Sequence, residues 1–335
     1  AAFLAASLAS QAQQAPLWMR YPAISPDGKT IVFSYKGDIY SVPATGGEAR
    51  QLTTNAAHDS YPIWSPDGKK IAFASNREGS LDVYVMSAHG GAPTRITTNS
   101  EREIPVAFKD NDHVLFSANI MPTAESNLFA SREFSQVYEV STQGGRPKLY
   151  SVIPMEDISI NAKGQVLYHD SKGYEDQWRK HHTSPITRDI WMLDNGKYQK
   201  ITAFKGEDRT PVWAADGESF YYLSEQAGSF NIYHRNIATG KDVQLTHEKK
   251  NPIRFLTSSA DGLLCYGYDG EIYTVKEGAQ PQKVNISITA DNDEPSLVRQ
   301  VRSWGATEIA LSPDAKEVAF VMHGDVYVTS TEYKT

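Results

Sequence analysis

A short turn motif recurs along this chain within a longer repeated unit, and the repeat constrains the fold more than any other feature. The motif Ser-Pro-Asp-Gly occupies residues 25–28 and 65–68, and weaker copies occupy 215–217, 260–262 and 312–315. An apolar run follows each copy. After it comes an acidic or amide residue with a branched and an aromatic residue, at 38–40, 82–84, 189–191, 231–233, 271–273 and 325–327. With a degenerate copy around 114–138, the unit returns roughly every 40–53 residues, as in propeller blades and solenoids.

The chemistry of the repeated unit predicts a four-stranded blade. Proline presets φ at the second turn position, aspartate suits the third, and glycine adopts the left-handed conformation that closes a hairpin. In the second copy, residues 61–64, 70–74, 82–86 and 94–97 are then successive strands. One such sheet cannot bury both of its faces, so the blades must stack around an axis.

The acidic or amide residue before each branched-aromatic pair has two interpretations. It could belong to a ring of charge around the central channel. We favour a local role, in which its side chain satisfies backbone donors where the third strand of each blade begins.

Composition agrees with a large single core and excludes two classes of protein. The chain has 335 residues, 40% of them hydrophobic and 11% aromatic. Its net charge of −7, with both signs interspersed, argues against nucleic-acid binding, for which a clustered basic face is expected. No apolar run approaches the roughly 18 residues that a membrane helix needs, so we predict no membrane span.

The first residues differ in kind from the repeats. Residues 1–9 are small and apolar, and residues 10–12 offer the small side chains that precede a signal-peptidase cut. We interpret residues 1–15 as the remnant of a secretory signal peptide or a disordered segment; an expression remnant or a short helix is the alternative. No cysteine follows this segment, and the lone Cys265 reads as a small core residue. We therefore expect a bacterial protein that is periplasmic or secreted, and not lipid-anchored.

The number of blades depends on how the last repeats are assigned. Six units run from about residue 20 to residue 285, with residues 282–286 predicted as the outer strand of the sixth. An acidic stretch ending at Pro295 follows, and a further unit starts at Ala306. Either the N-terminal segment completes this unit and closes a seven-bladed ring, or the unit opens a second propeller. The long acidic interruption favours the second arrangement.

The predicted fold class is therefore all-β, a β-propeller of four-stranded antiparallel blades with six blades plus the start of a further blade. Seven blades is the alternative. The predicted domains are the signal remnant at 1–15, the six-bladed propeller at 16–288, a linker at 289–305 and the first strands of a truncated second propeller at 306–335.

The repeats resemble those of TolB-like and WD-related propellers. A narrower resemblance lies in residues 173–184 and 187–191, and in residues 304–306 leading into 311–314. These stretches look like the front of bacterial tricorn-type serine peptidases, over essentially residues 16–335. The resemblance implies a six-bladed propeller followed by a seven-bladed one, a PDZ-like domain and a serine-peptidase core. The catalytic residues of that family belong to the later parts, so none is carried onto this sequence.

The sequence itself also nominates no catalytic set. It has no Gly-x-Ser-x-Gly elbow, no His-Glu-x-x-His helix and no phosphate-binding glycine loop. Adjacent side chains such as His181 and His182 point to opposite faces of an extended segment, which favours a structural or partner-binding role over a metal site. We predict no catalytic residue, no metal and no cofactor in this chain.

One insertion stands out as a candidate binding segment. The connection from His169 to Arg188 is long, and long connections in compact domains tend to be functional or disordered. Aromatic and arginine side chains carry most of the energy of interfaces. The candidate residues, which we expect on one rim in contact with a peptide, domain or subunit, are Tyr174, Trp178, Arg179, His181, His182 and Arg188. The alternative is a local plug over a blade edge.

Two functions of different classes remain open, and a third is a further option. In the first, the chain is the non-catalytic front of a secreted peptidase and gates or binds peptides for a distant active site. In the second, it is a stand-alone TolB-like scaffold for other envelope proteins. The third, the propeller of a dipeptidyl-peptidase-like enzyme, requires an α/β-hydrolase region elsewhere. Expected partners are downstream domains of the same polypeptide and peptide substrates, and a homo-oligomer is left open. A reading frame that continues past Thr335 into a PDZ-like and serine-peptidase region would favour the first function.

Overall fold

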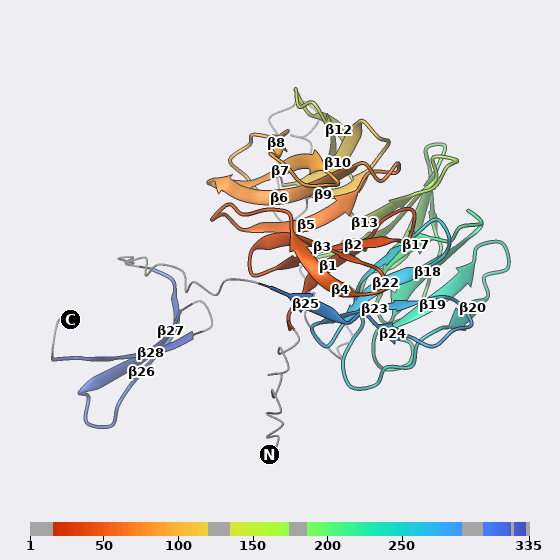
Figure 1. The fold of residues 1–335 in the computed structure, drawn as a ribbon. Coiled ribbons are helices and arrows are strands. Elements are labelled where there is room, and N and C mark those ends of the chain that lie inside the picture. Colours follow the sequence, from red (N-terminus) through yellow and green to blue (C-terminus); the bar gives the residue numbers. More distant parts are fainter. Residues whose placement is uncertain (1–15, 120–134, 174–185, 290–303, 323–324, 333–335) are drawn as a thin grey trace, which may run out of the picture. The chain divides into compact units, whose positions relative to one another are not determined.

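The computed structural model describes residues 16–119, 135–173, 186–289, 304–322 and 325–332. The chain divides into two compact units, residues 1–289 and 290–335 (Figure 1). Within the described residues the elements are β-strands, and no helix is long and apolar enough to cross a membrane. The predicted all-β class is confirmed.

The first unit consists of six antiparallel sheets, each built from four consecutive strands. Blade 1 contains β1 (Arg20–Ile24), β2 (Thr30–Tyr35), β3 (Asp38–Pro43) and β4 (Gly47–Gln51). Blade 2 contains β5 (Asp59–Trp64), β6 (Lys70–Glu78), β7 (Ser80–Ser87) and β8 (Thr94–Arg95). Blade 3 contains β9 (Glu103–Phe108), β10 (His113–Ala118), β11 (Gln136–Ser141) and β12 (Lys148–Ser151).

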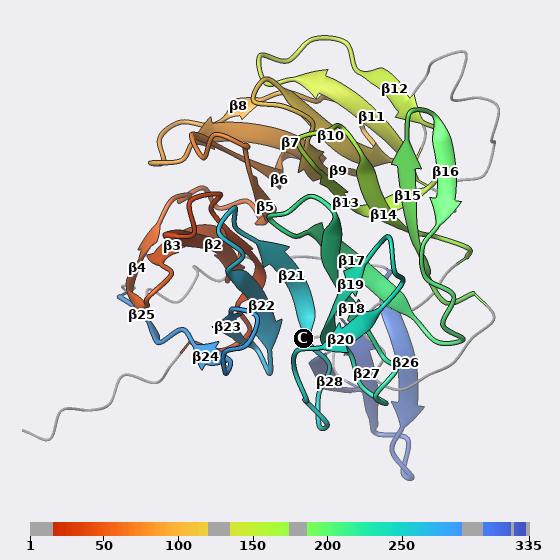
Figure 2. The same cartoon turned by 90° about the vertical axis from the view of Figure 1, so that its right-hand side faces the viewer.

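Blade 4 contains β13 (Met155–Ile160), β14 (Val166–Asp170), β15 (Ile190–Asp194) and β16 (Lys197–Lys200). Blade 5 contains β17 (Asp208–Trp213), β18 (Ser219–Ser224), β19 (Asn231–Asn236) and β20 (Asp242–Gln244). Blade 6 contains β21 (Arg254–Ser258), β22 (Leu264–Tyr268), β23 (Glu271–Val275) and β24 (Gln282–Lys283). In Figure 2 the later strands of the blades, such as β4, β12 and β16, lie toward the outside of the ring.

The recurrent turn motif joins the first two strands of a blade, as the sequence predicts. In blade 2 the Ser65 hydroxyl donates to Asp67 Oδ1 at 2.7 Å, and the same carboxylate oxygen accepts the Lys69 N–H at 3.1 Å. Gly68 has φ +68°, the left-handed conformation that closes the turn. The turn of blade 2 is thus held by its own side chains.

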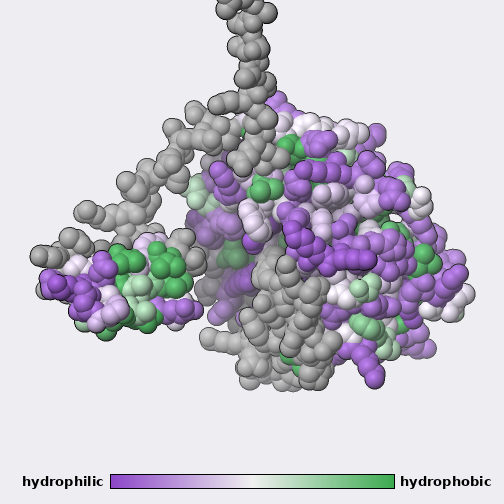
Figure 3. All heavy atoms as spheres, turned by 90° about the horizontal axis from the view of Figure 1, so that it is seen from below, coloured by the Kyte–Doolittle hydropathy of each residue, from purple (hydrophilic) through white to green (hydrophobic). Residues whose placement is uncertain are grey.

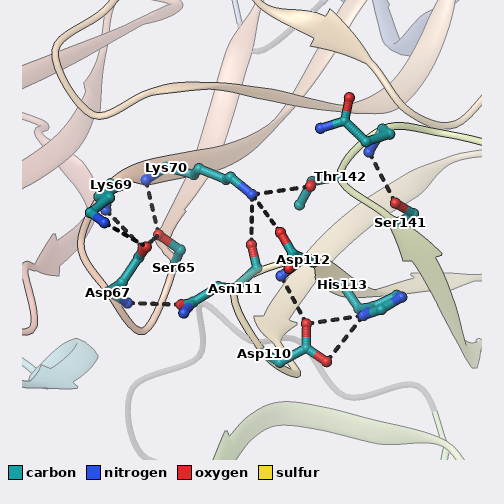
Figure 4. A network of polar contacts seen from close by, with 11 residues as sticks. Ser65, Asp67, Lys69, Lys70, Asp110, Asn111, Asp112, His113, Ser141 and Thr142 are labelled. Atoms are coloured by element: carbon teal, nitrogen blue, oxygen red, sulfur yellow. Dashed lines mark hydrogen bonds and ion pairs between the residues drawn. The ribbon is translucent and has the colours of Figure 1, made fainter.

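The turn of blade 2 is also tied to blade 3 (Figure 4). Lys70 Nζ donates to the Asn111 carbonyl at 2.8 Å, to Asp112 Oδ1 at 3.0 Å and to the Thr142 hydroxyl at 3.2 Å. The Asp67 N–H donates to Asn111 Oδ1 at 3.0 Å. These bonds fix the rotation of one blade against the next.

Blades stack through apolar clusters that each combine side chains of two neighbours. Between blades 1 and 2, for example, Val32 and Ile39 pack with Ile71 and Phe73, and all four are fully buried. A cross-strand aromatic pair recurs inside the blades, as in Phe73 and Tyr84, whose ring centroids are 5.9 Å apart. The recurring branched-aromatic pairs of the sequence therefore build the core, because the branched residue and the aromatic residue face opposite neighbours.

The ring closes with six blades. The innermost strands contact one another in the cycle β1, β5, β9, β13, β17, β21 and back to β1. At the seam between blades 6 and 1, Cys265 and Ile272 pack with Phe33 and Val42 in one buried cluster. The prediction that Cys265 is a core residue is confirmed, and the seven-bladed alternative is not what the ring shows.

A fifth strand completes the seam, and here one prediction is wrong. Residues 282–286 do not form one outer strand of blade 6. β24 (Gln282–Lys283) pairs with β23, and the Val284 N–H still donates to the Ile272 carbonyl at 2.9 Å. β25 (Ile286–Ile288) instead pairs in parallel with β4 of blade 1. Ile286 and Ile288 are buried there, so burial against the first blade outweighs continuation of the strand on blade 6.

In blades 1 and 5 the residue that precedes the branched-aromatic pair acts locally, as expected, but through a threonine. The Ile39 N–H donates to the Thr53 hydroxyl oxygen at 2.9 Å, and that hydroxyl donates to Asp38 Oδ1 at 3.1 Å. In blade 5, Ile232, Thr246 and Asn231 repeat the arrangement. The N–H of the branched residue is accepted by the threonine hydroxyl and not by the carboxylate or amide, although Asn231 Oδ1 also accepts the Glu248 N–H at 2.7 Å.

The second unit contains one sheet of three strands, β26 (Ala306–Leu311), β27 (Glu317–Met322) and β28 (Asp325–Ser330). It carries the same stacked aromatic pair as the blades, in Phe320 and Tyr327 at 5.5 Å. Ile309, Leu311 and Val328 are exposed, and Figure 3 shows hydrophobic residues gathered on this sheet among hydrophilic ones. The sheet is thus one more repeat of the same unit, and its role as the start of a second propeller stays a prediction.

Candidate functional site

A cavity of about 1060 Å³ runs along the axis of the propeller. Its walls are contributed by all six innermost strands, β1, β5, β9, β13, β17 and β21, and by the turns that follow five of them, β9 being the exception. Six-residue strands are about 20 Å long. The cavity is at the upper end of the roughly 300–1,000 Å³ that small-molecule sites occupy, and its length suits an extended chain.

Five of the six innermost strands carry a β-bulge at the same position near their start. In each, two residues oppose one residue of the second strand, and the first of the two is a non-glycine residue with positive φ. We call these five residues the collar: Tyr21, Tyr61, Asp157, Thr210 and Phe255. All five line the cavity. The exception is β9, in which no residue has positive φ.

Three blades contribute an aromatic arc to the collar. The Tyr21 ring lies between those of Phe255 and Tyr61, with centroid distances of 4.9 Å and 4.1 Å. Arg102, just before β9, donates to the Tyr61 hydroxyl at 2.9 Å and lies 5.7 Å from the centre of its ring. Burial is the main cause that raises the pKa of Tyr21, so this phenol stays neutral.

Blades 4 and 5 contribute a polar arc to the collar. The Thr210 hydroxyl donates to Asp157 Oδ2 at 2.6 Å. Behind them lies the buried imidazole of His169, whose Nδ1 accepts the Thr210 N–H at 3.2 Å. Because Nδ1 is an acceptor, Nε2 carries the proton and donates to Glu156 Oε2 at 3.0 Å.

Glu156 is the most strongly perturbed carboxylate of this arc. Burial alone would raise its pKa, but the hydrogen bond from His169 and the guanidinium of Arg188 outweigh burial and bring the pKa to about 2. Arg188 Nε donates to Glu156 Oε2 at 3.2 Å, and Arg188 Nη1 donates to the fully buried Glu207 at 3.3 Å. Glu156, Arg188 and Glu207 therefore form an ion-pair network behind the polar arc.

The predicted binding residues are placed only in part. Arg188 lines the cavity and is 7% exposed, within its ion pairs to Glu156 and Glu207. The other candidates, Tyr174, Trp178, Arg179, His181 and His182, lie outside the described residues. At the described ends of this connection, Lys172 Nζ donates to the Thr187 carbonyl at 2.6 Å. The binding role of the segment stays a prediction.

Sequence reasoning missed the collar, although a signal for it exists. Tyr21, Tyr61 and Thr210 each precede a proline, at positions 22, 62 and 211. The inner edge of an innermost strand has no pairing strand, so a proline there removes no ladder hydrogen bond. Recurrent X-Pro pairs therefore mark innermost strands, but Ile104 and Pro105 in β9 show that such a pair does not by itself specify the positive-φ bulge.

One group of side chains imitates a catalytic triad. His234 Nε2 lies 2.8 Å from the Ser219 hydroxyl, and His234 Nδ1 lies 3.1 Å from Glu277. However, Ser219 is 1% exposed and its hydroxyl donates to Asp216 at 2.7 Å. A nucleophile must reach a substrate carbonyl and give its proton to the base, and this serine does neither.

Ser219 has a structural explanation instead. In blade 5, Ala214 occupies the place of the turn serine, so the hydroxyl that normally binds the turn aspartate is absent. Ser219 supplies it to Asp216 from the next strand. Among the described residues, no group of three or more His, Cys, Asp or Glu could hold a metal ion.

Three solved structures with the same fold are a tricorn protease, a TolB and a puromycin hydrolase. Tricorn protease is 20% identical over 94% of this chain and 30% of that chain, with a TM-score of 0.70. TolB from Acinetobacter baumannii is 17% identical over 77% of this chain and 61% of that one, with a TM-score of 0.56. A mutant puromycin hydrolase is 12% identical over 96% and 53%, with a TM-score of 0.52. At these identities the likeness shows the fold.

The chain thus spans about 30% of the tricorn protease chain that it matches. No match was found among curated proteins. Residues 16–281 match the family described as the tricorn protease N-terminal beta propeller domain. This match covers the six blades up to the end of β23, and the chain belongs to the tricorn protease N-terminal propeller family.

Proposed function

We propose that this chain is the non-catalytic channel module of a secreted serine peptidase. Its axial cavity admits and holds extended peptides for an active site outside residues 1–335. The observation that carries the proposal is the cavity itself, about 1060 Å³ and walled by all six innermost strands. The partners are then peptide substrates and other domains of the same polypeptide, and the signal-like residues 1–12 support export from the cytoplasm.

The walls suit a peptide better than a compact polar ligand. Between the collar and the far turns they are mostly apolar or small, with Ile63, Val106, Val212 and Leu256 among them. Such a wall tolerates many side chains, while the polar groups of the collar can orient the chain. The absence of an accessible nucleophile at the Ser219 contact is consistent with binding without cleavage.

A blocked cavity tests this function. Val106 lines the cavity from β9 and is partly exposed, so V106W places an indole in the lumen. Val243 on β20 is 43% exposed and is not a cavity residue, so V243W is the matched control. Binding of a fluorescein-labelled, end-blocked decapeptide of mixed sequence is measured by fluorescence anisotropy, with melting temperatures to confirm that both variants fold.

We expect V106W to weaken peptide binding by about tenfold or more, which corresponds to roughly 1.4 kcal/mol, and V243W to leave it unchanged. Equal binding by both variants would place the peptide outside the channel and contradict the proposal. A scaffold for envelope proteins, the alternative from the sequence, would bind its partners on the outer surface and would be insensitive to V106W.

A further inference from the structure

We propose that the aromatic arc of the collar and Arg102 form a subsite for a peptide segment in which an acidic side chain adjoins an aromatic one. The inference rests on the proposed function, since it assumes that peptides enter the channel, and it names the class of peptide that the collar prefers.

The first observation is the strain in the collar. A non-glycine residue with φ near +50° to +60° brings its Cβ close to the backbone, which costs free energy at each position. The propeller does not need this strain, because β9 completes an equivalent blade without it. Strained backbone that the fold does not require gathers at functional sites. Of the ten described non-glycine residues with positive φ, the five at these bulges all line the cavity, whereas the others, such as Lys36 and Asn195, do not.

The second observation is the aromatic arc. Tyr21, Tyr61 and Phe255 are only partly buried, although each contacts another ring. The three rings come from three different blades and meet at the cavity wall. Aromatic rings prefer offset or edge-to-face partners, and this arc offers both ring faces and ring edges to a side chain inside the channel.

The third observation is the charge beside the arc. Arg102 is exposed and lines the cavity, and among the described residues it makes no ion pair. The Tyr61 hydroxyl accepts one of the five N–H groups that a guanidinium carries. A guanidinium held in this way favours a carboxylate, which it can bind through charge-assisted hydrogen bonds.

The polar arc sets the orientation of the peptide. In a ring of six blades, Asp157 on blade 4 lies opposite Tyr21 on blade 1. Its carboxylate is 49% exposed and repels an acidic side chain. The favoured arrangement therefore places an aromatic side chain of the peptide against Tyr21 and Tyr61 and its acidic neighbour at Arg102, away from Asp157.

The experiment uses end-blocked hexapeptides, so that no terminal charge contributes. The reference peptide has an aspartate followed by a phenylalanine among glycines. One analogue has asparagine for the aspartate, and the other has leucine for the phenylalanine. Binding of each to the full chain is measured by anisotropy. The wild-type protein should bind the reference about fivefold to tenfold more tightly than either analogue.

Three variants separate the two preferences. R102Q should lose the preference for aspartate over asparagine and keep the preference for phenylalanine over leucine. Y61F keeps the ring but removes the hydroxyl that positions Arg102, so it should weaken the aspartate preference alone. K163Q removes a cation from the turn after β13, at the opposite end of the strands, and should change neither preference.

The outcomes distinguish this inference from the proposed function. If all three peptides bind the wild-type protein equally, or if R102Q keeps the aspartate preference, the subsite is wrong and the channel function stands. If none of the peptides binds, and the mixed decapeptide does not bind either, both are wrong.

Discussion

The backbone N–H of Gly47 donates to the carbonyl oxygen of Asn285 at 2.9 Å, and this bond joins the end of the sixth blade to the first. The adjacent Gly46 has φ +89°, and a Cβ placed on it would lie 2.6 Å from the same Asn285 oxygen. The hairpin glycine of blade 1 is therefore what allows β25 to lie against β4.

Replacing Gly46 should destabilise the propeller by more than backbone strain alone. G46A introduces a left-handed alanine, which costs about 1–2 kcal/mol, and also displaces β25. Gly144 occupies the equivalent hairpin position in blade 3 with φ +80°, and a Cβ there meets nothing closer than 3.9 Å. G144A is thus the control, because it introduces the same backbone strain without a clash of the new Cβ with a neighbouring strand. Urea unfolding should show a larger loss for G46A, and equal losses would mean that β25 contributes little to closure.

The Thr246 hydroxyl, which lies between the backbone at the start of β19 and the Asn231 amide, should contribute strongly to the stability of blade 5. Thr246 is 1% exposed, accepts the Ile232 N–H at 2.9 Å and donates to Asn231 at 3.0 Å. T246V keeps the shape but leaves a buried N–H unpaired, which should cost about 1–3 kcal/mol of unfolding free energy. T94V, at an exposed position in β8, should stay within about 0.5 kcal/mol of the wild type. Similar values for the two variants would refute the role given to Thr246.

The buried carboxyl of Glu103 should make the stability of the propeller depend on pH. Burial is the main cause that raises the pKa of this carboxyl to about 7, and Asp82 adds to it. In the unfolded chain the ordinary value is 4.5. The folded state therefore holds the proton more tightly, and this contribution to stability is present below pH 4.5 and is lost as the pH rises to about 7.

E103Q should consequently be more stable than the wild type at pH 8, by up to about 3 kcal/mol, and similar to it at pH 4.5. E101Q changes a partly exposed glutamate two residues away and should follow the wild type at both pH values. Unfolding by urea at pH 4.5, 6 and 8 gives the comparison. A difference between E103Q and wild type that does not vary with pH would contradict the buried-carboxyl account.

The chain should not hydrolyse peptides. Purified residues 1–335 incubated with casein or short peptides should leave them intact by mass spectrometry, since the one described Ser-His-carboxylate contact has a buried serine whose hydroxyl serves Asp216. S219A tests this directly. Activity that persists through repurification and disappears in S219A would show that the contact is catalytic after all.

The sequence alone predicts the blades because each is encoded locally. The turn motif at Ser65–Gly68 and the branched-aromatic pair at Val83 and Tyr84 carry the information for their own hairpins. The partner of a strand is not encoded in this way. Ile286 and Ile288 look like an extension of the sixth blade, and only the tertiary structure shows that β4 is their neighbour.

The candidate site was predicted less well for the same reason. Arg188 was recognised by residue type, but its partners Glu156, on β13, and Glu207, just before β17, belong to different blades that only the closed ring brings together. The collar depends on backbone conformation, and residues such as Tyr21 or Phe255 have no local preference for a left-handed bulge. Only the prolines after three of them hint at it.

Photo-crosslinking tests the central claim, that the axial channel holds peptides. An end-blocked decapeptide carrying a benzophenone group is irradiated with the full chain, and the crosslinked residues are located by mass spectrometry. We expect crosslinks on the innermost strands β1, β5, β9, β13, β17 and β21, and their loss in V106W. Crosslinks confined to outer strands such as β4, β12 and β16, or an unchanged pattern in V106W, would contradict the account.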